Sequence, residues 1–362
     1  MKRLNSIQYL RAIAALLVLY AHAIDLQLFF GSSFQQHFFY LENFGAIGVD
    51  IFFVISGFII AYIANDQVGA KAAIDFMKRR IIRIVPVYWI ISAALLLLIL
   101  LVGNSPLSKV NIAKTITILP VLDRGPVFWS PVLFLGWTLA FEFFFYLLFF
   151  ILILFGVLRK EILVITIMLA LVAAGQLFHS NNIQWKFITN PIILEFSCGV
   201  LIGWIYRSRI KIPLAATKIF IAAGILLMML LIWKGNINVS EMDDTIDGSR
   251  SMLRFIFWGL PSAVLAFGFV FFEKASSTAS FNNKWILLTG DASYSIYLVH
   301  ILVYRGIYFI LKKIPAVVSV VPGDLQIPIY MLTAIIVSIG FYVLVERKLL
   351  KLLSRNPARI TG

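Results

Sequence analysis

The chain has 362 residues, with 31 Lys and Arg against 17 Asp and Glu, and its formal net charge is +14. Only 13% of the residues are charged, which is about half the share in a soluble domain, while 61% are hydrophobic and the mean hydropathy is +0.95. A soluble globule could not hide so much apolar surface, and a disordered chain would not contain it. The composition therefore predicts an all-α polytopic membrane protein.

Ten apolar segments are long enough to cross about 30 Å of hydrocarbon as helices. They cover residues 7–29, 46–64, 81–102, 132–157, 162–178, 190–206, 217–233, 253–272, 293–311 and 327–345. The opening residues imitate a secretory signal with a cleavage site near Ala23, but the apolar run continues to Phe30. We therefore expect a retained first helix, a membrane domain over 1–346 and a short basic cytoplasmic tail over 347–362.

The basic residues predict the orientation of the spans. With a cytoplasmic N-terminus, 19 Lys and Arg fall in cytoplasmic segments and 8 on the other side. This bias follows the positive-inside rule, so we expect both termini in the cytoplasm, with the spans among membrane lipids. The same interleaving of basic and apolar residues argues against a nucleic-acid partner. The lone Cys198 excludes an intramolecular disulfide, and no metal-binding motif is present.

The first apolar segment contains two ionisable residues, Arg11 and His22. Eleven helical residues make three turns plus about 20°, so both side chains project from one face about 16 Å apart along the axis. Asp25 shares the face of His22. A snorkelling arginine and a histidine that only hydrogen-bonds a neighbouring helix would also explain this pattern.

The next two segments carry further charges. Asp50 lies in the first turn of the second segment, where a helix dipole alone would favour a carboxylate. Arg80 and Arg83 precede Pro86 and share one cationic face that suits a phosphate group. The positive-inside rule accounts for Arg80 and its neighbour Arg79 without a ligand, but less easily for Arg83.

The later segments contain polar stripes within apolar surroundings. Thr138, Glu142 and Tyr146 recur at every fourth position in a run rich in phenylalanine. A carboxylate at mid-membrane depth is costly, so Glu142 is a candidate functional residue. Tyr297 and His300 share a face of the ninth segment, although tyrosine is readily structural there.

The sixth segment contains a carboxylate and a glycine motif. Glu195 is a second intramembrane carboxylate, and Gly199-x-x-x-Gly203 is a helix-packing motif.

Taken together, the charged residues of all these segments predict a cationic cytoplasmic mouth that leads to a histidine and carboxylates. This arrangement suits a polyanionic cytosolic ligand whose phosphates bind the arginines.

These motifs resemble the membrane acyltransferase family 3, whose members are O-acyltransferases of bacterial surface carbohydrates. The resemblance covers nearly the whole chain, and Thr138 departs from the serine that is more frequent in the family. The matching motifs are Arg11 and His22 with ten residues between them, Gly48-Val-Asp-Ile-Phe-Phe-Val-Ile-Ser-Gly-Phe58, Arg80-x-x-Arg83, Trp137-Thr-Leu-x-x-Glu142 and Ser293-Tyr-Ser-Ile-Tyr-Leu-x-His300.

The resemblance implies a stand-alone member of the exopolysaccharide type, with acetyl-CoA or another short acyl-CoA as the donor. The acceptor would be a hydroxyl of an exported or lipid-linked carbohydrate, and the chain would lie in the inner membrane of a bacterium. His22 would be the base or acyl relay, and Asp50 or Glu142 would assist it. The donor would be bound by Arg11, Arg80, Arg83, Tyr297 and His300.

The residues leave a second function class open. A proton-coupled secondary transporter of a small anionic solute would use Glu142 or Glu195 as a proton relay. Transporters often carry inverted repeats and broken helices in matching positions, and none is evident in the sequence. The sequence specifies neither the acceptor sugar, nor the acyl chain, nor the oligomeric state.

Overall fold

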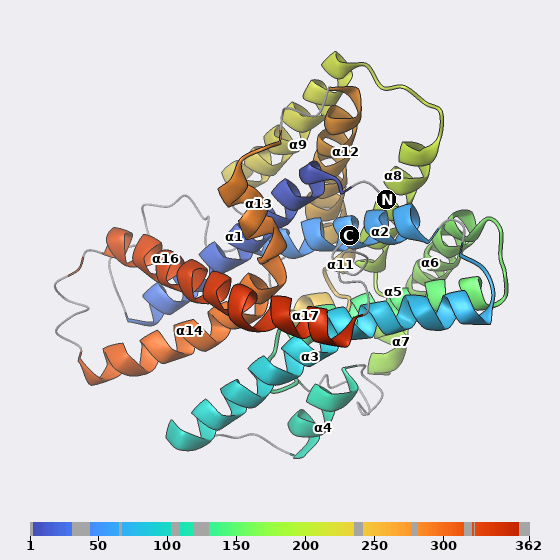
Figure 1. Cartoon of the computed structure of the whole chain (residues 1–362). Helices are drawn as coiled ribbons and strands as arrows, with labels where there is room; N and C mark the ends of the chain where they lie inside the picture. The colour runs from blue at the N-terminus through green and yellow to red at the C-terminus, as the bar shows by residue number, and fades with distance from the viewer. Residues whose placement is uncertain are drawn as a thin grey trace.

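The computed structural model describes residues 3–30, 44–64, 67–102, 109–118, 130–234, 242–276, 281–314, 321 and 323–354. Within these ranges all regular secondary structure is helical, and the helices form a bundle with inclined axes (Figure 1). The all-α prediction is therefore confirmed.

The helices are named in chain order, with two π-helical segments (η4, η5) and one 3₁₀ segment (η2). They are α1 (Asn5–Phe29), η2 (Phe44–Ala46), α2 (Ile47–Ile63), α3 (Ala70–Val102), α4 (Lys109–Thr117), α5 (Gly136–Leu154), α6 (Lys160–Leu177), α7 (Ile183–Ile188), α8 (Ile193–Arg207), α9 (Leu214–Lys234), α10 (Met242–Ile246), α11 (Ser251–Arg254), η4 (Phe255–Gly259), α12 (Leu260–Ala275), α13 (Lys284–Asp291), α14 (Ser293–Lys313), α16 (Gly323–Phe341), η5 (Tyr342–Glu346) and α17 (Arg347–Leu353).

Nine helical stretches in the described ranges are long and apolar enough to cross a membrane. Each contains or overlaps one of the predicted segments. The remaining prediction, 217–233, falls in α9, whose apolar part Leu214–Leu230 is shorter than the other nine. The chain is thus a multi-pass membrane protein.

Several helix ends differ from the predicted spans for identifiable reasons. α3 begins at Ala70 rather than near 81, because the helix continues beyond its apolar part. α5 ends at Leu154, and Gly156 with φ +68° terminates it in the left-handed conformation. The last predicted span continues through η5 and α17 to Leu353, so the first residues of the predicted tail are helical.

Helix α1 lies at the centre of the bundle, in contact with α2, α12, α13, α14 and α16 (Figure 1). Glycines allow its neighbours to approach closely. A Cβ atom on Gly48 of α2 would lie 2.3 Å from the Ala14 carbonyl oxygen, and one on Gly290 of α13 would lie 2.1 Å from the Gln8 carbonyl oxygen. These contacts fix α1, and hence Arg11 and His22, relative to the helices around it.

The predicted packing motif on α8 is confirmed. A Cβ atom on Gly199 would lie 2.0 Å from the Val54 carbonyl oxygen of α2, and one on Gly57 of α2 would lie 2.1 Å from the Phe196 carbonyl oxygen. Neither position has room for any side chain. α2 and α8 therefore pack backbone against backbone, as small residues allow in membrane helices.

The ends of three helices meet on one side of the bundle. The backbone N–H of Asn5 donates to Glu273 at 3.0 Å, and Lys274 donates to the carbonyl oxygens of Tyr206 and Ser208. The start of α1 therefore lies beside the ends of α8 and α12. The charge bias predicts that all three ends face the cytoplasm.

This topology can be tested by labelling single cysteines in a Cys198→Ser background with a membrane-impermeant thiol reagent. Ser180→Cys and Ile210→Cys both place the thiol at an exposed loop position, after α6 and after α8 respectively. We expect Ser180→Cys to react in intact spheroplasts and Ile210→Cys to react only after permeabilisation. The reverse labelling pattern would contradict the cytoplasmic placement of the termini.

Candidate functional site

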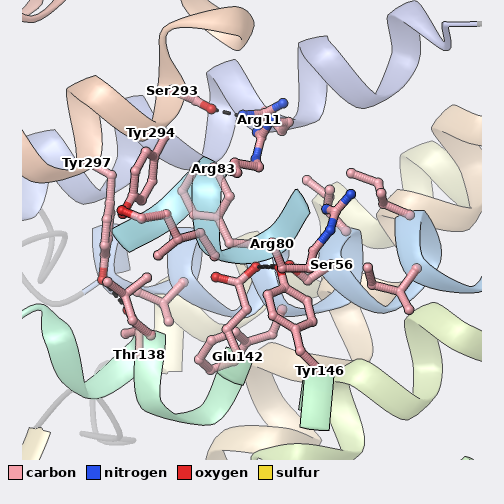
Figure 2. A pocket seen from close by; sticks show the side chains of 18 residues that line it. Arg11, Ser56, Arg80, Arg83, Thr138, Glu142, Tyr146, Ser293, Tyr294 and Tyr297 are labelled. Atoms are coloured by element: carbon pink, nitrogen blue, oxygen red, sulfur yellow. Dashed lines mark hydrogen bonds between the residues drawn. The ribbon is translucent and has the colours of Figure 1, made fainter. Parts of the chain in front are cut away.

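A cavity lies between α1, α2, α3, α5 and α14 (Figure 2). Its apolar wall comes mainly from α2 and includes Phe52 and Ile59. The polar side chains that line the cavity are Arg11, Ser56, Arg80, Arg83, Thr138, Glu142, Tyr146, Ser293, Tyr294 and Tyr297. They belong to five helices, so the site exists only in the assembled bundle.

The three arginines singled out in the sequence all line this cavity. Arg11 is 5% exposed and donates from Nε to Ser293 Oγ at 3.1 Å. Arg80 is 2% exposed, and its Nε and Nη2 have no hydrogen-bond partner among the described residues. Each unsatisfied buried donor costs roughly 1–3 kcal/mol, and more when the group is charged. An anion that enters the cavity would remove this cost.

Glu142 lies on the same wall as Arg80 and accepts two hydrogen bonds. Ser56 Oγ donates to it at 2.6 Å, and the Tyr146 hydroxyl donates to the same carboxylate oxygen (Figure 2). The Arg80 Cζ atom lies 5.9 Å from the centre of the Tyr146 ring. Ser56 is therefore part of a polar group that holds Glu142 in place.

His22 lies outside the lining of the cavity, near the other end of α1. Its Nδ1 is 3.0 Å from an oxygen of Asp25, and 25% of its side chain is exposed, against 63% for Asp25. The ring stacks on that of His300 at a centroid distance of 5.2 Å and meets Phe134 edge-on. His22 thus has a carboxylate partner one helical turn away, and part of its side chain remains exposed.

Tyr297 and His300 connect the cavity with His22. Tyr297 lines the cavity, and its hydroxyl lies 2.8 Å from the Thr138 hydroxyl oxygen. His300 is fully buried, its Nδ1 lies 2.8 Å from the Ile296 carbonyl oxygen, and its Nε2 has no partner among the described residues. The Tyr297 and His300 rings are 6.4 Å apart. The order from the cavity outward is therefore Tyr297, His300 and His22.

Asp50 is not part of the cavity lining and faces another part of the bundle. Arg254 donates to both of its carboxylate oxygens, at 3.0 and 2.8 Å, and the two side chains are only 1% and 0% exposed. The Arg254 Cζ atom also lies 5.0 Å from the Trp258 ring centre and 5.9 Å from that of Trp137. Asp50 therefore forms a bidentate buried ion pair that joins α2 to α11.

Sequence reasoning did not identify Arg254 as a functional or structural partner. The available signal was an isolated arginine at the edge of an apolar span, which requires a buried partner. Glu195 lies beside this pair, packed against Gly259 of η4, and neither of its oxygens has a hydrogen-bond partner in the described part of the chain.

The sequence matches the acyltransferase domain family over residues 4–343. It is 29% identical over 309 residues to the exopolysaccharide production protein ExoZ of Rhizobium meliloti, covering 85% of this chain and 90% of that protein. It is also 29% identical over 154 residues to the acyltransferase MdmB of Streptomyces mycarofaciens, covering 41% of this chain and 38% of MdmB. No solved structure matches the chain significantly.

The Asp50–Arg254 pair generates a stability prediction. Asp50→Leu leaves the Arg254 guanidinium buried without a counter-charge and should cost about 3–5 kcal/mol of unfolding free energy. The double variant Asp50→Leu, Arg254→Met removes both charges and should recover most of the loss. Thermal unfolding in detergent measures both effects, with Arg254→Met as the matched single variant.

Activity of the folded double variant decides the role predicted for Asp50. Transfer close to that of the wild type would mean that Asp50 acts through the fold alone. A stable but inactive double variant would instead support the predicted catalytic role.

Proposed function

Because the chain belongs to the acyltransferase domain family, we propose that it transfers an acetyl or other short acyl group from acyl-CoA to a carbohydrate hydroxyl. The acceptor we propose is an exported or lipid-linked surface glycan, since the relative that covers most of the chain is an exopolysaccharide production protein. Family membership also decides between the two function classes left open by the sequence, in favour of the enzyme.

The single observation that carries the proposal for the donor is the buried guanidinium of Arg80. Two of its donor atoms have no partner among the described residues, and they lie inside a cavity that Arg11 and Arg83 also line. Guanidinium groups bind phosphate through paired, charge-assisted hydrogen bonds. We assign the phosphates of acyl-CoA to these arginines, and the apolar wall of α2 to the uncharged arm that carries the thioester.

We assign proton removal from the acceptor hydroxyl to His22. A carbohydrate hydroxyl is a weak nucleophile near neutral pH and needs a base such as imidazole. In the proposed step, Asp25 accepts a hydrogen bond from Nδ1–H of His22, and Nε2 takes the proton of the hydroxyl as the hydroxyl oxygen attacks the thioester carbonyl carbon. The C–S bond then breaks, the acyl group stays on the carbohydrate oxygen, and the departing CoA sulfur takes the proton from Nε2 and leaves as the thiol. The 3.0 Å contact between His22 and Asp25 supports this tautomer.

Asp25 takes the supporting role in this proposal, in place of Asp50 or Glu142. Asp50 is fully engaged by Arg254, and Glu142 is held by Ser56 and Tyr146. We assign to Glu142 the role of holding the Arg80 side chain in position. The cavity lined by Arg11, Arg80 and Arg83 is called the donor cavity below. In this proposal the acyl group passes Tyr297, which lines the cavity and contacts Thr138, on its way to His22.

Replacement of Arg80 by lysine tests the donor site. Lysine keeps the charge but loses the paired geometry, so each lost charge-assisted contact should weaken donor binding by roughly 1.5–3 kcal/mol. The measurement is the KM for acetyl-CoA of the purified protein. Arg79→Lys is the matched control, because Arg79 donates to Gln67 at 3.2 Å and does not line the cavity. An unchanged KM for Arg80→Lys would refute phosphate binding by Arg80.

Replacement of His22 by glutamine tests the reaction itself. Glutamine retains hydrogen bonding but has no basicity, and a positioned base supplies typically 10²–10⁴-fold in rate. We expect acceptor-dependent CoA release to fall by about that factor, with CoA affinity and folded yield unchanged. Asp25→Asn should lower the rate by a smaller factor, and His179→Gln, at an exposed position after α6, should have no effect. Near-normal transfer by His22→Gln would make His22 a packing residue.

A further inference from the structure

A second pocket adjoins the donor cavity. Arg11 and Arg83 line both spaces, so the two meet at these residues. The second pocket, termed the outer pocket here, is also lined by Arg3, Asp291 and Arg347. In the described part of the chain, four arginines therefore face one carboxylate in this pocket.

The charge of the outer pocket is only partly compensated. Arg3 pairs with Asp291 at 2.8 Å, and these side chains are 51% and 24% exposed. Arg347 is exposed and has no hydrogen bond or ion pair with any described residue. Repulsion between arginines that line one pocket is unfavourable unless an anion is bound.

The position of Arg347 is fixed by the residue that precedes it. Glu346 ends η5, is 2% exposed and accepts a hydrogen bond from Ser295 of α14. This contact ties the last turn of η5 to α14, so α17 starts with Arg347 at the rim of the outer pocket. The π-helical turn is a feature often found at functional sites.

We propose that the outer pocket binds the phosphomonoester on the ribose of the CoA nucleotide, with Arg347 as its main contact. The inference rests on the proposed donor. CoA carries its thioester at one end, a diphosphate in the middle and the phosphomonoester at the other end. The protein presents the matching order: the inner cavity with the apolar wall of α2 and Arg80, then Arg11 and Arg83 at the junction, and then Arg3 and Arg347. A monoester carries about −1.5 to −2 charges at pH 7, which suits the most basic part of the path.

The test compares the binding of CoA and of dephospho-CoA, which lacks only this phosphate, to the full-length protein in detergent. Calorimetric titration should show that wild type binds CoA about 10-fold or more tightly than dephospho-CoA. Arg347→Gln should weaken CoA binding by a similar factor and leave dephospho-CoA binding unchanged, so that the preference disappears. Lys348→Gln is the matched control, because Lys348 is the adjacent exposed cation and does not line the pocket.

Three outcomes would overturn the inference. Arg347→Gln could weaken both ligands equally, which would indicate general electrostatic attraction. It could leave both affinities unchanged, or its effect could depend on added anionic lipid rather than on the monoester, which would assign the pocket to a headgroup. Because the readout is binding, absence of acyl transfer with a normal preference for CoA would contradict the proposed function and leave this inference intact.

Discussion

The cost of burying a guanidinium group among apolar helices distinguishes two arginines of this protein. Arg254 is 1% exposed and has both oxygens of Asp50 as partners, so its charge is compensated within the fold. Arg80 is 2% exposed and keeps two donor atoms without a partner in the described structure. Buried polar donors are costly unless they are hydrogen-bonded, and the two unsatisfied donors of Arg80 therefore call for an explanation. The pair around Arg254 supports the architecture, whereas in our proposal Arg80 marks the place where a ligand completes the site.

The rest of the site follows from the position of α1. This helix carries Arg11 on the donor cavity and His22 about 16 Å further along its axis. Close glycine contacts with α2 and α13 fix its depth in the bundle, and Ser293 of α14 fixes the side chain of Arg11. One rigid helix thereby sets the distance between Arg11, which we assign to phosphate binding, and His22, which we assign as the catalytic base. In our account, this distance is the one that the arm of the donor has to span.

The sequence predicted the relationships that depend on a single helix. Asp25 lies three residues after His22, and Arg80 and Arg83 are likewise three residues apart, so their shared faces follow from helical geometry. The start of α3 was less predictable, because an apolar run marks the part of a helix that lies in the hydrocarbon layer and not the residue at which the helix begins. Residues 70–80 are polar enough to end the apolar span while remaining helical.

Relationships between helices could not be predicted from one sequence. Asp50 and Arg254 are 204 positions apart, and nothing local pairs them. The stacking of His22 on His300 and the contact of Ser56 with Glu142 also depend on how the helices cross. Isolated charges in apolar spans indicated that partners must exist, but only the fold identifies them.

The central claim is that the cavity lined by Arg11, Arg80 and Arg83 binds the phosphates of acyl-CoA. An experimental structure of the protein determined with CoA tests it most directly, by cryo-electron microscopy in a lipid nanodisc. The account predicts phosphate density within hydrogen-bond distance of the Arg80 guanidinium and of the arginines at the junction of the two pockets. Nucleotide density elsewhere, with Arg80 still unpartnered or contacting only lipid, would contradict it.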